Sequence, residues 1–206
     1  MASDLLLPLF PLEVVLLPGA TLPLHIFEER YKLMIGEALE RRSEFGIVLA
    51  KGRSLANLGC SAEVEKVVKR YEDGRLDILT AGRRRFEILF LDDQKPYLQA
   101  AVHFIADDEA AAAPGPEVVA RVREWCARAA EYVPSMEAVA GGEEALDSFQ
   151  IAGLVPSDLE FKQRLLGQRS EAERMATLNE YLEKLVPRLQ TTRKTEAVSR
   201  GNGHAR

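Results

Sequence analysis

The sequence VEKVVKRYEDGRLDILT, residues 64–80, is the clearest structural signal in the chain. Two strand-like runs, Val64–Tyr71 and Leu76–Thr80, flank the turn sequence Glu72-Asp73-Gly74-Arg75. An Asp-Gly pair between such runs is typical of a β-hairpin, because glycine tolerates the positive φ that the turn requires. We therefore expect two antiparallel strands here, within a larger β-structure.

Other short apolar runs precede residue 107 and are separated by Gly, Pro and Asp. They are Leu7–Leu12, Val14–Leu17, Leu22–Ile26, Phe45–Leu49, Arg85–Leu91 and Tyr97–Ile105. The segment Glu28–Leu39 instead has apolar residues at helical spacing. About seven short strands and one helix must cover their apolar faces and edges, so we expect a partly closed β-barrel or a strongly bent sheet. Pro11 and Pro23 lack an N–H group, so their strands should lie at edges or carry bulges.

The character of the sequence changes near residue 107, where longer stretches with helical spacing begin. A helix start is expected at Pro116. About four helices are predicted. They comprise an apolar stripe over Val118–Val133, the segment Glu143–Leu154, and two helices opened by capping boxes, Ser157 with Glu160 and Ser170 with Glu173. Pro187 should end or kink the last helix at Val186.

The predicted fold class is therefore α+β. A barrel subdomain with one helix occupies residues 1–107, and residues 108–117 form a linker. A helical bundle follows over residues 118–190, and residues 191–206 form a flexible tail because they are polar and terminal.

The composition is that of an ordinary globular protein. Apolar residues make up 47% of the 206, and 32 acidic against 27 basic residues give a net charge of −5. Extensive disorder is excluded by this apolar content, and nucleic acid is disfavoured as a partner by the acidic balance. The apolar runs are too short to span a bilayer. Two distant cysteines, Cys60 and Cys126, fit a cytoplasmic location.

Familiar catalytic motifs are missing from the sequence. It contains no phosphate-binding Gly-x-x-x-x-Gly-Lys loop and no Gly-x-Ser-x-Gly elbow. Its three histidines, His25, His103 and His204, have no metal-ligand spacing. We therefore expect no catalytic residue, no metal site and no cofactor.

Three residues have both a functional and a structural interpretation. His25 is either a base or ligand, or a strand histidine that orders the following helix start. Arg85, within Arg83-Arg84-Arg85, is either part of a phosphate or carboxylate clamp, or a guanidinium bound to backbone carbonyl groups or to an acid at the sheet edge. Cys60 is either a reactive thiol or a small, partly buried residue.

A series of motifs runs through the chain in a fixed order. The opening holds Pro8–Leu12, Val15–Gly19 and Leu22-Pro23-Leu24-His25-Ile26-Phe27-Glu28-Glu29-Arg30-Tyr31. Later blocks are Phe45–Val48, Gly59–Val64, Asp73–Arg75, Gly82 with Arg85–Ile88, Tyr97–Ala100 and Pro156–Leu166. Over about residues 5–190 this pattern resembles the N-terminal, substrate-binding domain of Lon protease. Two departures are Glu29, where that family commonly has Pro, and Cys60, where Thr is usual.

The resemblance implies a PUA-like β-barrel followed by a helical bundle, in a stand-alone member of the family without ATPase and protease domains. It also implies six candidate ligand contacts, which are His25, Phe27, Arg30, Tyr31, Arg85 and Phe86. Structural roles are the alternative for several of them: Phe27 and Tyr31 in the core, Arg30 and Arg85 as buried polar bridges.

Our leading hypothesis is a non-enzymatic binding module or adaptor in protein quality control, whose partner is an unfolded or apolar polypeptide or a partner protein. Binding would use an apolar concave surface between barrel and bundle, or an unpaired strand edge. The alternative is an RNA-binding PUA-like protein, with a basic face formed by Arg83–Arg85, Lys66, Lys69 and Arg70. A hydrolase is the third hypothesis, although no nucleophile–base pair is visible.

Overall fold

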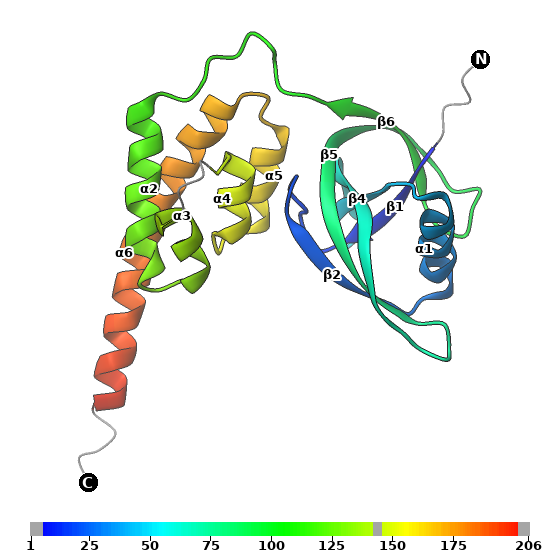
Figure 1. Ribbon diagram of the computed structural model, residues 1–206, viewed down its shortest axis with the longest axis horizontal. Helices are drawn as coiled ribbons and strands as arrows, with labels where there is room; N and C mark the ends of the chain where they lie inside the picture. The colour runs from blue at the N-terminus through cyan, green and yellow to red at the C-terminus, as the bar shows by residue number, and fades with distance from the viewer. Residues whose placement is uncertain (1–5, 142–145, 202–206) are drawn as a thin grey trace. The chain divides into compact units, whose positions relative to one another are not determined.

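The computed structural model describes residues 6–141 and 146–201 (Figure 1). The chain forms two compact units. The first contains the chain up to Ala106 together with Asp158–Arg169, and the second contains Asp107–Ser157 and the chain from Ser170 onward. The α+β class is confirmed, because the first unit holds all the described strands and the second is helical.

Six strands form the sheet of the first unit. They are β1 (Leu7–Leu12), β2 (Thr21–Ile26), β3 (Phe45–Lys51), β4 (Ser54–Arg70), β5 (Leu76–Asp92) and β6 (Gln99–Ile105). Their order is β2-β5-β4-β3-β1-β6, and an additional pairing of β5 with β6 closes five of them into a ring. Only β2 lies outside that ring, so the barrel is partly closed as expected. Pro23 lies in β2, whose only described partner is β5, as a strand proline requires.

The two longest strands, β4 and β5, differ from the prediction. Each has 17 residues, so Leu76–Thr80 and Arg85–Leu91 are parts of one strand and not two. Register shifts in the β4–β5 ladder mark bulges, which bend the strands. One half of β5 thereby pairs with β2 and the other half with β6. The predicted hairpin between them is confirmed, with Gly74 at a φ of 81°.

The predicted strand Val14–Leu17 is wrong. These residues form a connection without a strand partner, although Leu16 and Leu17 are buried in the core. The backbone after them is held by Gly19, whose N–H donates to the carbonyl oxygen of Gly82. The run has the apolar composition of a strand, but its side chains are buried without the backbone pairing of a strand.

Phe86 lies at the centre of the barrel core and is fully buried. Its ring crosses Gly46 of β3 and Gly59 of β4, where an added Cβ would approach ring atoms to 2.7 Å and 2.4 Å. Both glycines are therefore needed for space. The helix α1 (Glu29–Arg41) lies beside these strands and buries Tyr31, which stacks on Phe10 with ring centroids 4.1 Å apart (Figure 1).

The helix α5 (Leu159–Gly167) packs with the strands of the first unit. We expected residues 118–190 to form one bundle, so the boundary differs here. The physical reason is that Arg85 and the carbonyl oxygen of Leu58 bond to this segment, the latter accepting from Gln163 Nε2 at 3.0 Å. The cap of α5 is also corrected: Asp158, and not Ser157, accepts from the N–H of Phe161.

The second unit consists of helices α2 (Pro116–Ala130), η1 (Pro134–Met136), α3 (Glu137–Gly141), α4 (Ser148–Leu154) and α6 (Glu171–Gly201). As predicted, α2 begins at Pro116. Helix α6 runs through Pro187 to Gly201, so Pro187 does not end the helix at Val186, and the alternative of a kink there stays a prediction. Of the predicted helix Glu143–Leu154, residues 143–145 lie outside the described residues.

A buried arginine organises the second unit. The guanidinium of Arg174 donates to Ser148 Oγ at 2.8 Å and to Asp107 Oδ1 at 2.7 Å, and it also bonds to Glu171 Oε2 at 2.7 Å. Two carboxylates therefore surround a cation that is almost completely excluded from water. Removal of the arginine would leave both of them without this partner.

Candidate functional site

Two of the six candidate residues, His25 and Phe27, lie together on the surface. His25 Nδ1 is 2.6 Å from Asp77 Oδ1, and Tyr71 donates from its hydroxyl to Asp77 Oδ2 at 2.8 Å. Both contacts lower the pKa of Asp77, and the hydrogen bond with His25 has the larger effect. The ring of Phe27 stacks at 5.9 Å from that of His25 and is 59% exposed. The group is a polar cross-strand contact with an exposed aromatic ring beside it.

Arg30 and Tyr31 lie at the start of α1 in different environments. Arg30 is exposed and donates from Nε to Glu28 Oε2 at 2.9 Å. Tyr31 is buried, and the pKa of its hydroxyl is raised, mainly because burial removes the hydroxyl from water. Tyr31 therefore belongs to the core, whereas the expected core position of Phe27 does not hold.

Arg85 and Phe86 are both buried, so neither is placed to contact a ligand at the surface. Arg85 Nη1 donates to the carbonyl oxygen of Leu166 at 3.1 Å and also to that of Gln168. This geometry corresponds to the second interpretation given above, a guanidinium bound to backbone carbonyl groups. The six candidates are thus not brought together into one site.

The other arginines of the basic cluster are paired with acids. Arg83 donates to Glu63 Oε2 at 3.1 Å, and Arg84 donates to Glu44 Oε2 from two nitrogens at 3.0 Å and 3.2 Å. With Arg85 buried, the cluster presents little uncompensated positive charge to a phosphate backbone. The RNA-binding hypothesis also named Lys66, Lys69 and Arg70, which are exposed on β4, so it stays a prediction.

Both cysteines are buried free thiols. Desolvation raises the pKa of Cys60 and that of Cys126 to about 12. A thiol at such a pKa is almost entirely protonated near neutral pH and is a poor nucleophile. Cys60 is therefore a core residue, and it is fully buried where the structural interpretation expected partial burial.

An apolar surface on β5 was not predicted. Leu89, Phe90 and Leu91 are consecutive and are 63%, 58% and 50% exposed. The last pair between β4 and β5 joins Leu58 to Glu87, so among the described strands only β6 pairs with Ile88–Asp92. We call Ile88–Asp92 the open edge. Three successive apolar residues in a strand cannot all face one core, and this was the available signal.

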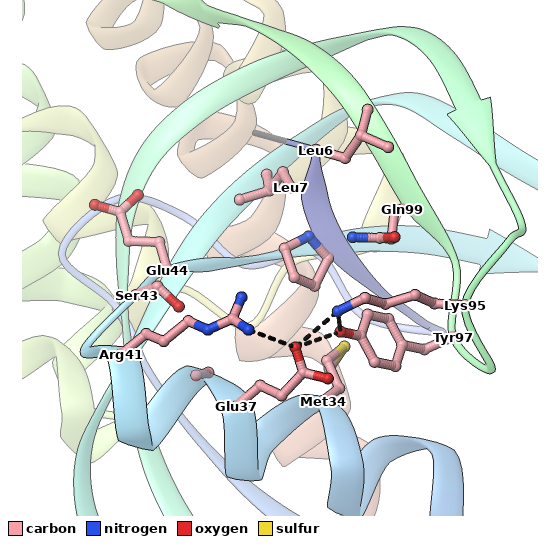
Figure 2. A pocket seen from close by; sticks show the side chains of 12 residues that line it. Leu6, Leu7, Met34, Glu37, Arg41, Ser43, Glu44, Lys95, Tyr97 and Gln99 are labelled. Carbon is pink, nitrogen blue, oxygen red and sulfur yellow. Dashed lines mark hydrogen bonds and ion pairs between the residues drawn. The ribbon is translucent and has the colours of Figure 1, made fainter. Parts of the chain in front are cut away.

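A pocket of about 330 Å³ lies between α1, the start of β1 and the connection from β5 to β6 (Figure 2). Its apolar wall contains Leu7, Pro8, Met34 and Ala38. We call this cavity the α1 pocket. It lies at the small end of the range for ligand sites, which is enough for one large side chain.

The polar side of the α1 pocket is centred on Glu37 (Figure 2). Glu37 Oε2 accepts from Lys95 Nζ at 2.7 Å and from the Tyr97 hydroxyl at 3.1 Å. The hydrogen bond from Lys95 is the main cause that lowers the pKa of Glu37. The same hydrogen bond is the main cause that raises the pKa of Lys95. Arg41 Nη2 approaches the same oxygen from the other side, at 3.7 Å.

The described residues contain no group of three or more His, Cys, Asp or Glu that could hold a metal ion. No helix in the described parts of the chain combines the length and the apolar character needed to cross a membrane.

The sequence has relatives among Lon proteases. The chain is 29% identical over 110 residues to Lon protease of Parabacteroides distasonis, an alignment covering 49% of this chain and 13% of that protein. It is 25% identical over 213 residues to Lon protease of Anaeromyxobacter dehalogenans, covering 95% and 25%. The chain thus spans a quarter or less of the length of these relatives.

Two solved structures share the fold. A Lon N-terminal domain protein from Xanthomonas campestris has a TM-score of 0.63 and 26% identity, covering 84% of this chain and 96% of that one. The N-terminal domain of Lon protease from the Mycobacterium avium complex has a TM-score of 0.67 at 18% identity, covering 87% and 99%. The sequence model of the ATP-dependent protease La (LON) substrate-binding domain matches residues 6–184. On these matches, the chain belongs to the Lon substrate-binding domain family.

Proposed function

We propose that this chain recognises unfolded or apolar polypeptide segments by adding them as an extra strand to the open edge. The observation that carries the proposal is the coincidence of unpaired backbone with three exposed apolar side chains, Leu89, Phe90 and Leu91. Backbone hydrogen bonds to an added strand do not depend on sequence. The apolar side chains would then favour apolar segments over polar ones.

The second edge of the sheet is less suited to this role. Strand β2 has β5 as its only described partner, so its outer edge is open as well. However, Pro23 interrupts its N–H groups, and its exposed positions include Thr21 and His25. Proline and polar residues are the usual means of blunting an edge strand. The open edge of β5 has no proline between Ile88 and Asp92.

The family supports recognition of polypeptide in general. The family is that of a substrate-binding domain, and the relatives are Lon proteases. The proposal assigns recognition, and no catalytic step, to this chain. We keep a cytoplasmic location as part of the proposal, since two buried free thiols suit a reducing compartment.

Fluorescence anisotropy with a labelled, reduced and carboxymethylated α-lactalbumin tests the proposal. Phe90→Asp places a charge in the apolar surface without touching the core, and it should weaken binding about tenfold or more. Val68→Asp is the matched control, because Val68 is a similarly exposed apolar residue on β4. Equal binding by the wild type, Phe90→Asp and Val68→Asp would refute the site.

Self-association through the same edge is a different outcome and is measured separately. Sedimentation velocity of the wild type over a range of concentrations reports it. A dimer that dissociates on Phe90→Asp, together with no binding of the unfolded protein, would replace our proposal by a homodimer interface.

A further inference from the structure

The α1 pocket has an apolar wall and, beside it, a cation that is not fully compensated. Met34 and Ala38 of α1 are buried beneath the pocket, and Leu7 and Pro8 of β1 extend this wall. Figure 2 shows Arg41 and Lys95 approaching Glu37 from opposite sides at the polar end of the pocket. An occupant must therefore present an apolar group and a polar group close together.

The charges around the pocket decide the sign of that polar group. Four charged side chains line it: Glu37, Arg41, Glu44 and Lys95. Glu44 is already held from outside by two hydrogen bonds from Arg84. With Arg84 included, three cations face two carboxylates, so one positive charge remains.

Arg41 is the side chain that carries this excess. Its guanidinium is 3.7 Å from Glu37 Oε2, beyond hydrogen-bond distance, and its side chain is 65% exposed. It makes no hydrogen bond to the part of the chain that the structure describes. Lys95, in contrast, donates to both Glu37 and Tyr97. The Arg41 donors are thus available to an anion.

The end of helix α1 opposes an anion only weakly. A helix C-terminus carries a partial negative charge of about one half, which is less than the full charge of Arg41. In addition, the carbonyl oxygen of Ala38 is already occupied by the N–H groups of Arg42 and Ser43. The guanidinium therefore determines the preference.

A carboxylate suits the excess charge better than a phosphate does. One net positive charge matches one negative charge, whereas a phosphate carries nearly two near neutral pH. Carboxylates also accept two parallel hydrogen bonds from a guanidinium. The C-terminal residue of a polypeptide carries a carboxylate and a side chain on the same Cα, so it presents an anionic group and an apolar group close together.

We propose that the α1 pocket binds the C-terminal residue of a polypeptide, with an apolar side chain against Leu7 and Met34 and its carboxylate at Arg41. This inference rests on the proposed function and narrows the polypeptides to those with an apolar, unblocked C-terminus. The pocket is lined by α1, the start of β1 and the connection from β5 to β6, and none of the open-edge residues Ile88–Asp92 lines it, so the two sites can be tested separately.

Anisotropy with an internally labelled hexapeptide ending in Ala-Ala-Leu tests this inference. The peptide with a free carboxylate should bind at least about tenfold more tightly than its C-terminal amide. Replacing the terminal Leu by Gly should also weaken binding about tenfold, since the apolar contact is lost. Equal binding of acid and amide, or preference for a peptide with a free amino terminus and an amidated C-terminus, would overturn the inference.

Variants of the protein identify the cation. Arg41→Gln should abolish the preference for the acid over the amide, while Arg42→Gln, which removes the same charge beside the pocket, should retain it. A preference that persists in Arg41→Gln contradicts our assignment. Phe90→Asp should leave peptide binding unchanged, so failure at the α1 pocket is distinguishable from failure at the open edge.

Discussion

Arg85 Nη1 donates a 3.1 Å hydrogen bond to the backbone carbonyl oxygen of Leu166, 81 residues further along the chain. The same nitrogen donates to the carbonyl oxygen of Gln168 at the end of α5. A buried cation on β5 thus satisfies the end of a helix that is remote in sequence. This contact explains why α5 belongs with the barrel strands.

Loss of this contact should destabilise the first unit. Arg85→Met leaves two carbonyl groups without their donor and should lower the free energy of unfolding by about 2–4 kcal/mol. Arg83→Gln breaks an exposed ion pair and should cost less than about 1 kcal/mol. Urea denaturation followed by circular dichroism measures both. Equal stability of the two variants would show that the Arg85 hydrogen bonds are not important for folding.

The contact between Gly46 and Phe86 should make the barrel intolerant of a methyl group. Gly46→Ala places a Cβ 2.7 Å from both the Phe86 ring and Leu9, so it should cost about 1–3 kcal/mol. In the double variant with Phe86→Leu the cost should be less than additive, because the ring is removed.

Gly36 in α1 provides the control for that substitution. A Cβ there meets no atom within 4 Å, so Gly36→Ala should stabilise the protein by up to about 1 kcal/mol. Denaturation midpoints of the four variants measure these effects. Strict additivity of Gly46→Ala and Phe86→Leu would contradict the proposed steric cause.

Asp77 should contribute to the dependence of stability on pH. Its pKa is lowered from the ordinary value of 3.8, mainly by the hydrogen bond with His25 and then by the one from Tyr71. A lowered carboxyl pKa stabilises the folded state above the unfolded value, and this contribution is lost as the pH falls through the folded pKa. Asp77→Asn should therefore be less stable than the wild type at pH 7, with the difference shrinking towards pH 3.

The control for this experiment is Asp93→Asn, which makes the same change of charge in the connection from β5 to β6. Urea midpoints between pH 3 and 7 give the comparison. A difference between Asp77→Asn and the wild type that stays constant over this range would exclude the carboxylate contacts as its source.

The two cysteines should be inert in the folded protein. Burial raises both thiol pKa values to about 12, so neither should react with Ellman's reagent at pH 8. In urea, both should react at the rate of an unstructured thiol. Rapid labelling of Cys60 in the native state would instead support the reactive-thiol interpretation.

The sequence predicted those parts of the fold that depend on local chemistry. The Asp73-Gly74 turn, the start of α2 at Pro116 and the core positions of α1 are determined by backbone preference or by apolar spacing over a few residues. The continuity of β5 through Arg83 and Arg84 was missed, because two exposed polar residues look like a break between strands. The ladder with β4 shifts register at these two residues, and only the flanking pairs, Gly82 with Ala62 and Arg85 with Cys60, show that the strand continues.

The functional surface was harder to predict because exposure depends on distant partners. Phe90 lies beyond Glu87, the last residue of β5 that pairs with β4, where Leu58 is its partner. No local sequence pattern indicates where this pairing stops. Likewise, the α1 pocket joins Leu7, Arg41 and Lys95 from three separated segments. The motif residues Tyr31 and Phe86 were noticed in the sequence but are core residues.

Hydrogen–deuterium exchange with and without unfolded carboxymethylated α-lactalbumin tests the central claim most directly. An added strand must accept hydrogen bonds from the outward-facing N–H groups of the open edge, so exchange over Ile88–Asp92 should slow when the unfolded protein binds. The β2 edge, Thr21–Ile26, is measured in the same experiment and should stay unchanged. Saturating binding with unaltered exchange over Ile88–Asp92 would contradict strand addition at β5.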